Sequence, residues 1–208
     1  MLSLQSYLAD PCGAASLPYW KQKEIVIPDQ MRIVHDRNYV PSMFPDADDE
    51  PYFKLSHDLK VIETYASPDI QIMSEPSAID EFVSLINASY DDLGVTAEQM
   101  ARYQQTSVFH PDLWVLLREK GTGTVLGGGI ADYDSEAREV SLEWIQVLPA
   151  CRKRGYGRMI VNHLLATMQG EARFATVSGK VNNPSCPEKL YRQCGFAGQD
   201  VWHILTLK

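Results

Sequence analysis

Between residues 147 and 160, a glycine-rich and positively charged turn separates a predicted strand from a predicted helix. Gly155 and Gly157 let a ligand come close to the backbone, and the first amides of a helix have no partners within the helix. Together with the helix dipole, such amides bind anions such as a pyrophosphate. A basic, solvated helix start is the alternative. The cations that crowd this turn, in a chain of net charge −8, are Arg152, Lys153, Arg154 and Arg158.

Two other phosphate-binding patterns do not fit this chain. A Walker loop needs GxxxxGK[ST], which the sequence lacks. A dinucleotide-binding pattern GxGxxG that begins at Gly155 would need a third glycine where Ile160 stands. The glycine run at 127–129 lies inside a predicted strand, where it indicates a bulge or close backbone packing.

Two motifs carry a resemblance to a known family. Arg152-x-x-Gly155-x-Gly157 resembles the [Q/R]xxGx[G/A] signature of GNAT-type N-acetyltransferases, and Leu190-Tyr191-x-x-x-Gly195-Phe196 is similar to their LYxxxGF segment. The order of predicted elements extends the resemblance over residues 70–208. It implies that the turn binds the pyrophosphate of acetyl-CoA, a co-substrate used without a metal. The resemblance places these residues at the cofactor: Ile145, Gln146, Val147, Arg152, Lys153, Arg154, Gly155, Tyr156, Gly157, Arg158 and Asn183.

Tyr191 matches the family tyrosine that lies near the sulfur of the cofactor. A phenol has a reference pKa of about 10, so it is protonated at neutral pH. It could therefore donate a proton to the departing thiolate as a general acid. The alternative is a core tyrosine with a local hydrogen bond.

Glu143 precedes the turn on the same predicted strand. Strict alternation along a strand puts Glu143, Ile145 and Val147 on one face. A carboxylate here resembles the one that some family members use, directly or through water, to take the proton of the amine. The alternative is an exposed strand residue that pairs with Arg138.

The chain departs from the family pattern before Tyr191. The family asparagine would fall on Pro184, and Asn183 stands one residue too early. Ser185 and Glu188 can still cap the helix that carries Tyr191. Cys186 and Cys194 flank this tyrosine, but packing or surface cysteines explain them better than a catalytic thiol.

Hydrophobic periodicity and turn residues predict an α/β (α+β) fold. Thr96 and Gln99 form a predicted capping box at the start of one helix. The resemblance implies a mixed, mostly antiparallel central sheet flanked by helices, with an N-terminal extension. The predicted strands are 31–34, 70–73, 113–117, 125–133, 140–147, 174–177 and 201–207; the predicted helices are one beginning at 16, then 77–89, one from 96, 154–168 and 188–194.

The chain changes character near residue 70. Seven of its twelve prolines but only one of its thirteen glycines fall in the first 70 residues. An X-Pro step at Ser67-Pro68 favours an extended connection, so we expect an extension at 1–69 and a catalytic domain at 70–208. The extension could be a lid on the acceptor site, a homodimer contact or a degenerate repeat. The acidic residues at 46–50 are interpreted as a solvated turn.

Composition narrows the function classes. Hydrophobic residues at 45% and charged residues at 22% are typical of a globular protein, and the net charge of −8 disfavours nucleic-acid binding. No apolar run reaches the ~20 residues that cross a bilayer, and no signal segment is recognised, so we expect a cytoplasmic protein. The four cysteines form no metal or disulfide framework.

The predicted function is direct transfer of an acetyl group from acetyl-CoA to a primary amine of a small molecule, amino acid or peptide. Acidic residues such as Asp132 and Asp134 could favour a cationic acceptor. A CoA-binding sensor without activity is the alternative, and a different nucleotide-binding enzyme is a third interpretation.

Overall fold

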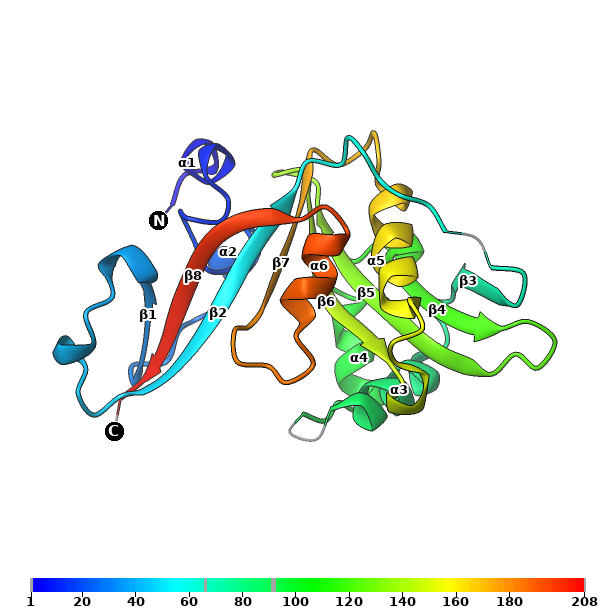
Figure 1. Cartoon of the computed structure of the whole chain (residues 1–208). Helices are drawn as coiled ribbons and strands as arrows, with labels where there is room; N and C mark the ends of the chain where they lie inside the picture. The colour runs from blue at the N-terminus through cyan, green and yellow to red at the C-terminus, as the bar shows by residue number, and fades with distance from the viewer. Residues whose placement is uncertain (1, 66, 91–92, 208) are drawn as a thin grey trace. The chain divides into compact units, whose positions relative to one another are not determined.

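The computed structural model describes residues 2–65, 67–90 and 93–207. The contacts divide the chain into two compact units, which are described separately. The first unit combines residues 1–57 with 176–208, and the second contains residues 58–175. Figure 1 labels the helices and strands in chain order.

The second unit contains four antiparallel strands in the order β6-β5-β4-β3. All four strand predictions are confirmed, including the hairpin around Asp134. The bounds are β3 (Ile70–Ser74), β4 (Trp114–Glu119), β5 (Val125–Asp134) and β6 (Glu139–Val147), with helices α3 (Ile79–Ser89), α4 (Ala97–Tyr103) and α5 (Tyr156–Thr167) and short 3-10 turns η3 (Pro111–Leu113) and η4 (Pro149–Cys151).

Helices cover both faces of this sheet. A Cβ added to Gly129 would lie 2.6 Å from Ile160 of α5, whereas one added to Gly128 would lie 3.0 Å from Leu85 of α3. Because neighbouring strand residues point to opposite faces, α5 and α3 lie on opposite faces of β5. Figure 1 shows this arrangement, with α5 over β5 and α3 behind it. The predicted close packing of the glycine run is confirmed.

The α3 face holds an apolar core. Thr96 and Gln99 form the predicted capping box that begins α4, with both reciprocal hydrogen bonds present. Removing buried apolar side chains from water stabilises such a layer by about 25 cal/mol per Å². The buried members of this core are Phe82, Leu85, Ile86, Val95, Met100, Trp114, Leu116 and Ile130.

In the first unit, β8 lies between two partners. Strand β8 (Ala197–Thr206) pairs antiparallel with β1 (Met31–His35) on one side and with β2 (Asp48–His57) on the other. This arrangement is visible in Figure 1. Strand β7 (Phe174–Lys180) begins in the second unit and continues into the first, where it lies next to β2. The remaining elements are α1 (Leu4–Ala9), α2 (Lys21–Glu24), η1 (Asp36–Asn38), η2 (Pro41–Met43) and α6 (Pro187–Gln193).

Two expectations for the N-terminal part were wrong, and one helix was missed. The acidic residues from Asp48 onward begin a ten-residue strand rather than a turn, because cross-strand partners on β8 take up their backbone groups. The helix expected from Ser16 begins only at Lys21, and α1 was not predicted.

A buried lysine binds the loop in which that helix was expected to begin. Lys54 is 1% exposed, and its ammonium donates to the carbonyl oxygens of Pro11, Ala15 and Leu17 at 2.8–3.0 Å. These carbonyls bind a cation from another strand instead of the amides of a helical turn. A buried ammonium needs such partners, since an unpaired buried charge is very unfavourable.

Antiparallel strands flanked by helices confirm the predicted fold class. Strand β6 runs from the hairpin at Glu139 directly to the glycine turn at residues 152–157. The fold therefore places the predicted cofactor residues of the second unit on one strand and the start of one helix.

Candidate functional site

The glycine turn has the backbone of an anion site. Gly155 has φ 84° and ψ −2°, and Lys153 also has a positive φ of 62°. Helix α5 follows at once, and its amide of Met159 donates to the carbonyl of Gly155 at 3.1 Å. The amides of residues 156–158 precede this bond and point out of the helix start. A Cβ at Gly155 would meet no protein atom within 4 Å, so open space lies over the turn.

Arg152 anchors the turn to the rest of the second unit. Its guanidinium donates to the carbonyl of Val147 at 3.2 Å and to the carbonyl of Ser89 at 3.0 Å. The first contact ties the turn to the end of β6, and the second ties it to the end of α3. Arg152 therefore positions the turn, whereas Lys153 and Arg154 are exposed cations beside it.

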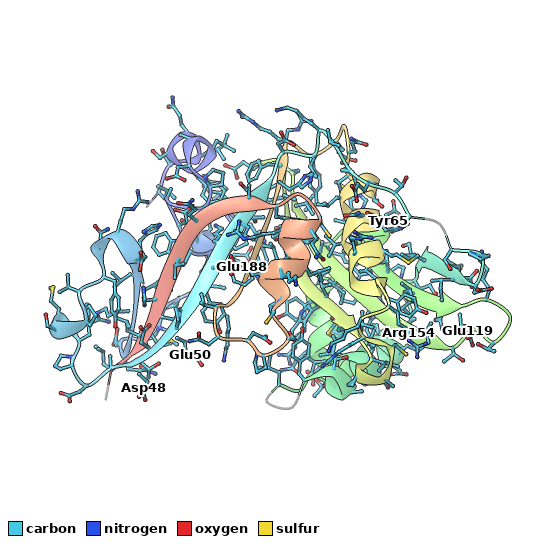
Figure 2. The ribbon with its side chains drawn as sticks, in the orientation of Figure 1. Asp48, Glu50, Tyr65, Glu119, Arg154 and Glu188 are labelled. Carbon is cyan, nitrogen blue, oxygen red and sulfur yellow. The ribbon has the colours of Figure 1, made fainter. Side chains whose placement is uncertain are left out.

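Arg158 lies one turn farther along α5. Its guanidinium carbon is 4.2 Å from the centre of the Tyr65 ring, a cation–π contact. The hydroxyl of Tyr65 in turn donates to Glu63. Figure 2 shows Tyr65 beside α5 and Arg154 near the beginning of that helix. Arg152, Lys153 and Arg154 are exposed and Arg158 is half-buried; of the exposed three, Arg152 is engaged with two backbone carbonyls.

Strand β6 is irregular at Glu143. The register pairs Leu142 with Ala131 and Trp144 with Ile130, which leaves Glu143 opposite no residue of β5. This bulge interrupts the strict alternation at Glu143, whereas Ile145 and Val147 share one face as predicted. The carboxylate is half-buried.

Beyond the bulge, the alternation resumes. Ile145 and Val147 contact the positions of Gly129 and Gly127 on the α5 face. Gln146 lies on the α3 face and is 4% exposed. Within the described residues, neither polar atom of its side-chain amide has a hydrogen-bond partner. The resemblance placed Gln146 at the cofactor through its backbone. The structure shows in addition that its side-chain amide is buried and, among the described residues, has no hydrogen-bond partner.

Tyr191 belongs to the first unit and lies on α6. Its side chain is 7% exposed and packs between Phe53 and Phe196, with ring centres 6.2 and 5.8 Å away. Gly195 follows the helix with φ 93°, as the C-terminal motif predicts. The aromatic contacts fix the ring, so the hydroxyl is held at the end of a rigid side chain.

The loop before α6 differs from the expectation. Ser185 does not cap the helix; Cys186 occupies the N-cap with a left-handed backbone at φ 50° and no side-chain cap bond. The carboxamide oxygen of Asn183 accepts hydrogen bonds from the amide and the hydroxyl of Ser185 at 2.9 and 2.7 Å. Asn183 thus stabilises its own turn. Pro184 and Pro187 have no backbone N–H, so neither residue can supply a hydrogen-bond donor to this loop.

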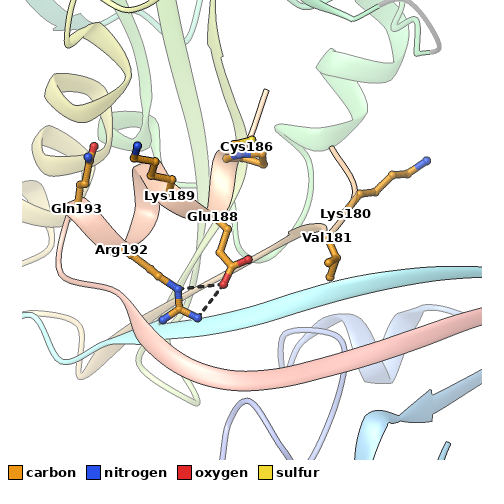
Figure 3. A pocket seen from close by; sticks show the side chains of 8 residues that line it. Lys180, Val181, Cys186, Glu188, Lys189, Arg192 and Gln193 are labelled. Carbon is orange, nitrogen blue, oxygen red and sulfur yellow. Dashed lines mark hydrogen bonds and ion pairs between the residues drawn. The ribbon is translucent and has the colours of Figure 1, made fainter. Parts of the chain in front are cut away.

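A pocket of about 580 Å³ opens beside α6. Figure 3 shows its lining, in which Arg192 donates to Glu188. Lys180 binds Glu50 at 2.8 Å, and the ammonium of Lys189 adds a further cation. The pocket is positively charged and lies on the helix that carries Tyr191.

Burial shifts the pKa of one cysteine and one histidine among the described residues. Burial raises the pKa of the Cys12 thiol to about 11, so this cysteine stays protonated. Burial also lowers the pKa of His163 on α5. No group of three or more His, Cys, Asp or Glu side chains in the described part of the chain could hold a metal ion. No described helix is long and apolar enough to cross a membrane.

A polar patch on β5 and β6 was only partly predicted. Asp132 lies opposite Ser141, and Asp134 lies opposite Glu139. All four side chains are less than a tenth exposed. The sequence signal was the recurrence of polar residues at every second position across the hairpin. Only Asp132 and Asp134 were singled out, since the partner strand's register decides which residues share their face.

Comparisons with known proteins agree with the predicted family and fold. The model of the acetyltransferase (GNAT) family matches residues 79–196, which is more than half of the chain. A search of curated proteins gave no match.

Several solved structures share the fold. A GCN5-related N-acetyltransferase from Sphaerobacter thermophilus aligns with a TM-score of 0.66 at 13% identity, over 89% of this chain and 62% of its own. This chain therefore spans less than two thirds of that protein's length. A GNAT-family acetyltransferase from Colwellia psychrerythraea aligns at 0.61 and 14% identity, over 91% of this chain and 69% of its own. The ribosomal-protein-S18-alanine N-acetyltransferase of Escherichia coli aligns at 0.52 and 18% identity, over 66% and 92%.

At these identities the structures show a common fold, while the family model covers both motifs that carried the resemblance. The glycine turn at the start of α5, the strand before it and the tyrosine helix all fall within the matched residues. The chain belongs to the GNAT family of acetyltransferases.

Proposed function

We propose that this protein transfers an acetyl group from acetyl-CoA to a primary amine, without a covalent enzyme intermediate. The observation that carries the proposal is the left-handed Gly155 turn, whose outward amides and open space begin α5 within the family match.

The cofactor residues follow from this turn. The pyrophosphate would accept hydrogen bonds from the amides of residues 155–158, with Lys153 and Arg154 adding positive charge. Arg152 would keep the turn in place through its two backbone contacts. The pantetheine arm would lie along β6, with backbone groups of 145–147 as partners.

The chemistry needs two protons removed from the acceptor ammonium and one supplied to the departing thiolate. Glu143, directly or through a water molecule, would accept the proton of the ammonium and leave a neutral amine. The amine nitrogen attacks the thioester carbonyl, the new C–N bond forms and the C–S bond breaks. Tyr191 would donate its phenolic proton to the departing thiolate, and the second proton lost from the nitrogen as the amide forms would restore the phenol, directly or through water, which leaves N-acetylated product and CoA.

The test is a thermal-shift titration of the full chain with acetyl-CoA, CoA, ATP and NAD, followed by thiol release with a panel of amines. A ligand at ~100 times its dissociation constant stabilises the folded state by about 2.7 kcal/mol. We expect a rise in melting temperature with acetyl-CoA and CoA alone. A larger rise with ATP or NAD would overturn the proposal, and a CoA-binding protein that releases no thiol with any amine would favour a sensor.

A matched pair of glycine variants locates the cofactor. Gly155 and Gly121 both have positive φ and open space around the Cβ position. Alanine at either site costs about 1–2 kcal/mol in backbone strain. We expect both variants to melt lower, but only Gly155→Ala to lose affinity for acetyl-CoA. Equal affinity in the two variants would exclude the turn as the binding site.

A further inference from the structure

Arg152 joins three elements of the second unit. Its Nε donates to the carbonyl of Val147 at the end of β6 at 3.2 Å, and its Nη2 donates to the carbonyl of Ser89, the last residue of α3, at 3.0 Å. Its backbone belongs to the glycine turn that leads into α5. A planar guanidinium presents several donors in a fixed geometry, so one side chain can hold both carbonyls.

The contact with Ser89 completes the C-terminus of α3. The last carbonyls of a helix have no partners within that helix, and a positive charge near them is favourable. Helix α3 carries no basic residue in its own last turn. Arg152 therefore supplies, from the glycine turn, the cation and the donor that the sequence of α3 lacks.

The end of α3 is also joined to the chain that follows it and to β6. The side chain of Asn87 accepts from the amide of Val95 at 2.8 Å and donates to its carbonyl at 3.1 Å. The ring of Tyr90, the C-cap residue, lies edge-on to the indole of Trp144, with ring centres 5.9 Å apart. We call this connected group the α3 cluster; its members are Asn87, Ser89, Tyr90, Val95 and Trp144.

The α3 cluster borders Glu143. Trp144 pairs with Ile130, and Glu143 stands just before it at the bulge. A bulge interrupts the ladder at that point, so the packing of neighbouring side chains helps to hold the strand there. Trp144 packs against the apolar core on the α3 face. A shift of Trp144 is therefore expected to shift the carboxylate of Glu143 as well.

We propose that Arg152 is a positioning residue that couples CoA bound at the glycine turn to the α3 cluster and, through Trp144, to Glu143. This inference rests on the proposed function.

The coupling follows from the backbone of the glycine turn. Lys153 and Gly155 both have positive φ, which is unfavourable for lysine. An anion that accepts hydrogen bonds from the amides of the turn fixes this backbone in place. With its own backbone fixed, Arg152 loses less conformational freedom when it holds the carbonyl of Ser89. CoA binding therefore stabilises the α3 cluster.

Hydrogen exchange of the Val95 amide reports on the α3 cluster without turnover. In the parent protein we expect saturating CoA to slow this exchange about fivefold or more. Arg152→Met removes both donors and keeps an unbranched side chain, so exchange should be faster without CoA and should no longer respond to it. Arg154→Met is the matched control, because it removes the same charge from an exposed residue of the same turn. It should weaken CoA binding and leave the response of Val95 to saturating CoA intact.

Steady-state kinetics test the connection to Glu143, with an amine that the parent protein acetylates. Small misplacements of reacting groups are costly, so Arg152→Met should lower kcat about tenfold at saturating acetyl-CoA. Arg154→Met should raise only the KM for acetyl-CoA. Tyr90→Leu removes the ring contact with Trp144 and should lower kcat as well. The losses from Arg152→Met and Tyr90→Leu should not add in the double variant, because both break one chain of contacts.

The outcomes separate this inference from the proposed function. Slowing of Val95 exchange by CoA that requires Arg152 supports the inference even if no amine is acetylated, which would refute the proposed function alone. If amines are acetylated but CoA leaves Val95 exchange unchanged, or slows it equally in the parent protein and Arg152→Met, the inference is overturned and the proposed function stands. Additive losses of kcat in the double variant would overturn the connection to Glu143. A protein that does not bind CoA would refute both.

Discussion

At the scale of single residues, the site depends on side chains whose positions are set by packing. Tyr191 is held between two aromatic rings, and Arg152 is held by two carbonyls. A side chain that packing already holds in place loses little conformational freedom when it takes part in a reaction. Both residues therefore suit roles in positioning the reacting groups. The sequence named both residues, and the structure shows what immobilises each.

Replacing Tyr191 by phenylalanine tests the proton donor. The ring contacts with Phe53 and Phe196 stay, so only the hydroxyl is lost. General acids contribute about a hundredfold or more, and we expect kcat to fall by about that factor with acetyl-CoA affinity unchanged. Steady-state kinetics and thermal shift measure the two quantities. Tyr19→Phe, at another buried tyrosine of this unit, is the control. Parent-like turnover in Tyr191→Phe would remove Tyr191 from the mechanism.

At the scale of elements, the start of α5 is positioned by how closely that helix approaches β5. Three consecutive glycines leave room for helices on both faces, and Ile160 and Leu164 occupy the space on one of them. A larger residue would push α5 outward together with the turn at its N-terminus. The glycine run therefore allows the close packing that positions the glycine turn at the start of α5.

Gly129→Ala tests this close approach. The new Cβ would lie 2.6 Å from Ile160 and 2.9 Å from Leu164, so side chains must shift. Overpacking of this kind costs about 1–3 kcal/mol. Urea denaturation should show that loss. Gly94→Ala provides the comparison, because its nearest neighbour would be 3.8 Å away. The packing argument fails if both variants unfold at the same urea concentration.

At the scale of the whole molecule, the two ends of the chain meet in one unit. Strand β8, near the C-terminus, takes both of its partners from the first 57 residues. The contact-defined units thus group residues 1–57 with 176–208. A separate functional role for residues 1–69 remains a proposal.

Removing residues 1–66 should leave an insoluble or much less stable protein. The deletion strips β8 of both β1 and β2 and exposes two unpaired edges, which promote aggregation. Solubility after expression and the melting temperature of any soluble fragment measure the effect against the full chain. A soluble fragment with unchanged melting would contradict the prediction.

Local signals determined a large part of this fold. The capping box of α4, the glycine end of α6 and the hairpin at Asp134 depend on neighbouring residues and were predicted correctly. The glycine turn was also recognised, since its glycines and cations are contiguous. Strand β2 was missed because its acidic start resembles a loop, and only pairing with a strand about 150 residues later makes it regular.

The sequence by itself determined the family, the glycine turn and the helix that carries Tyr191, because each rests on residues close together in the chain. The tertiary structure alone decided three other features. The register across the hairpin placed the bulge at Glu143 and assembled the polar patch on β5 and β6. The tertiary structure also buried Lys54, whose ammonium donates to three carbonyls of the loop before α2. These features depend on contacts between distant residues, which local propensity does not encode.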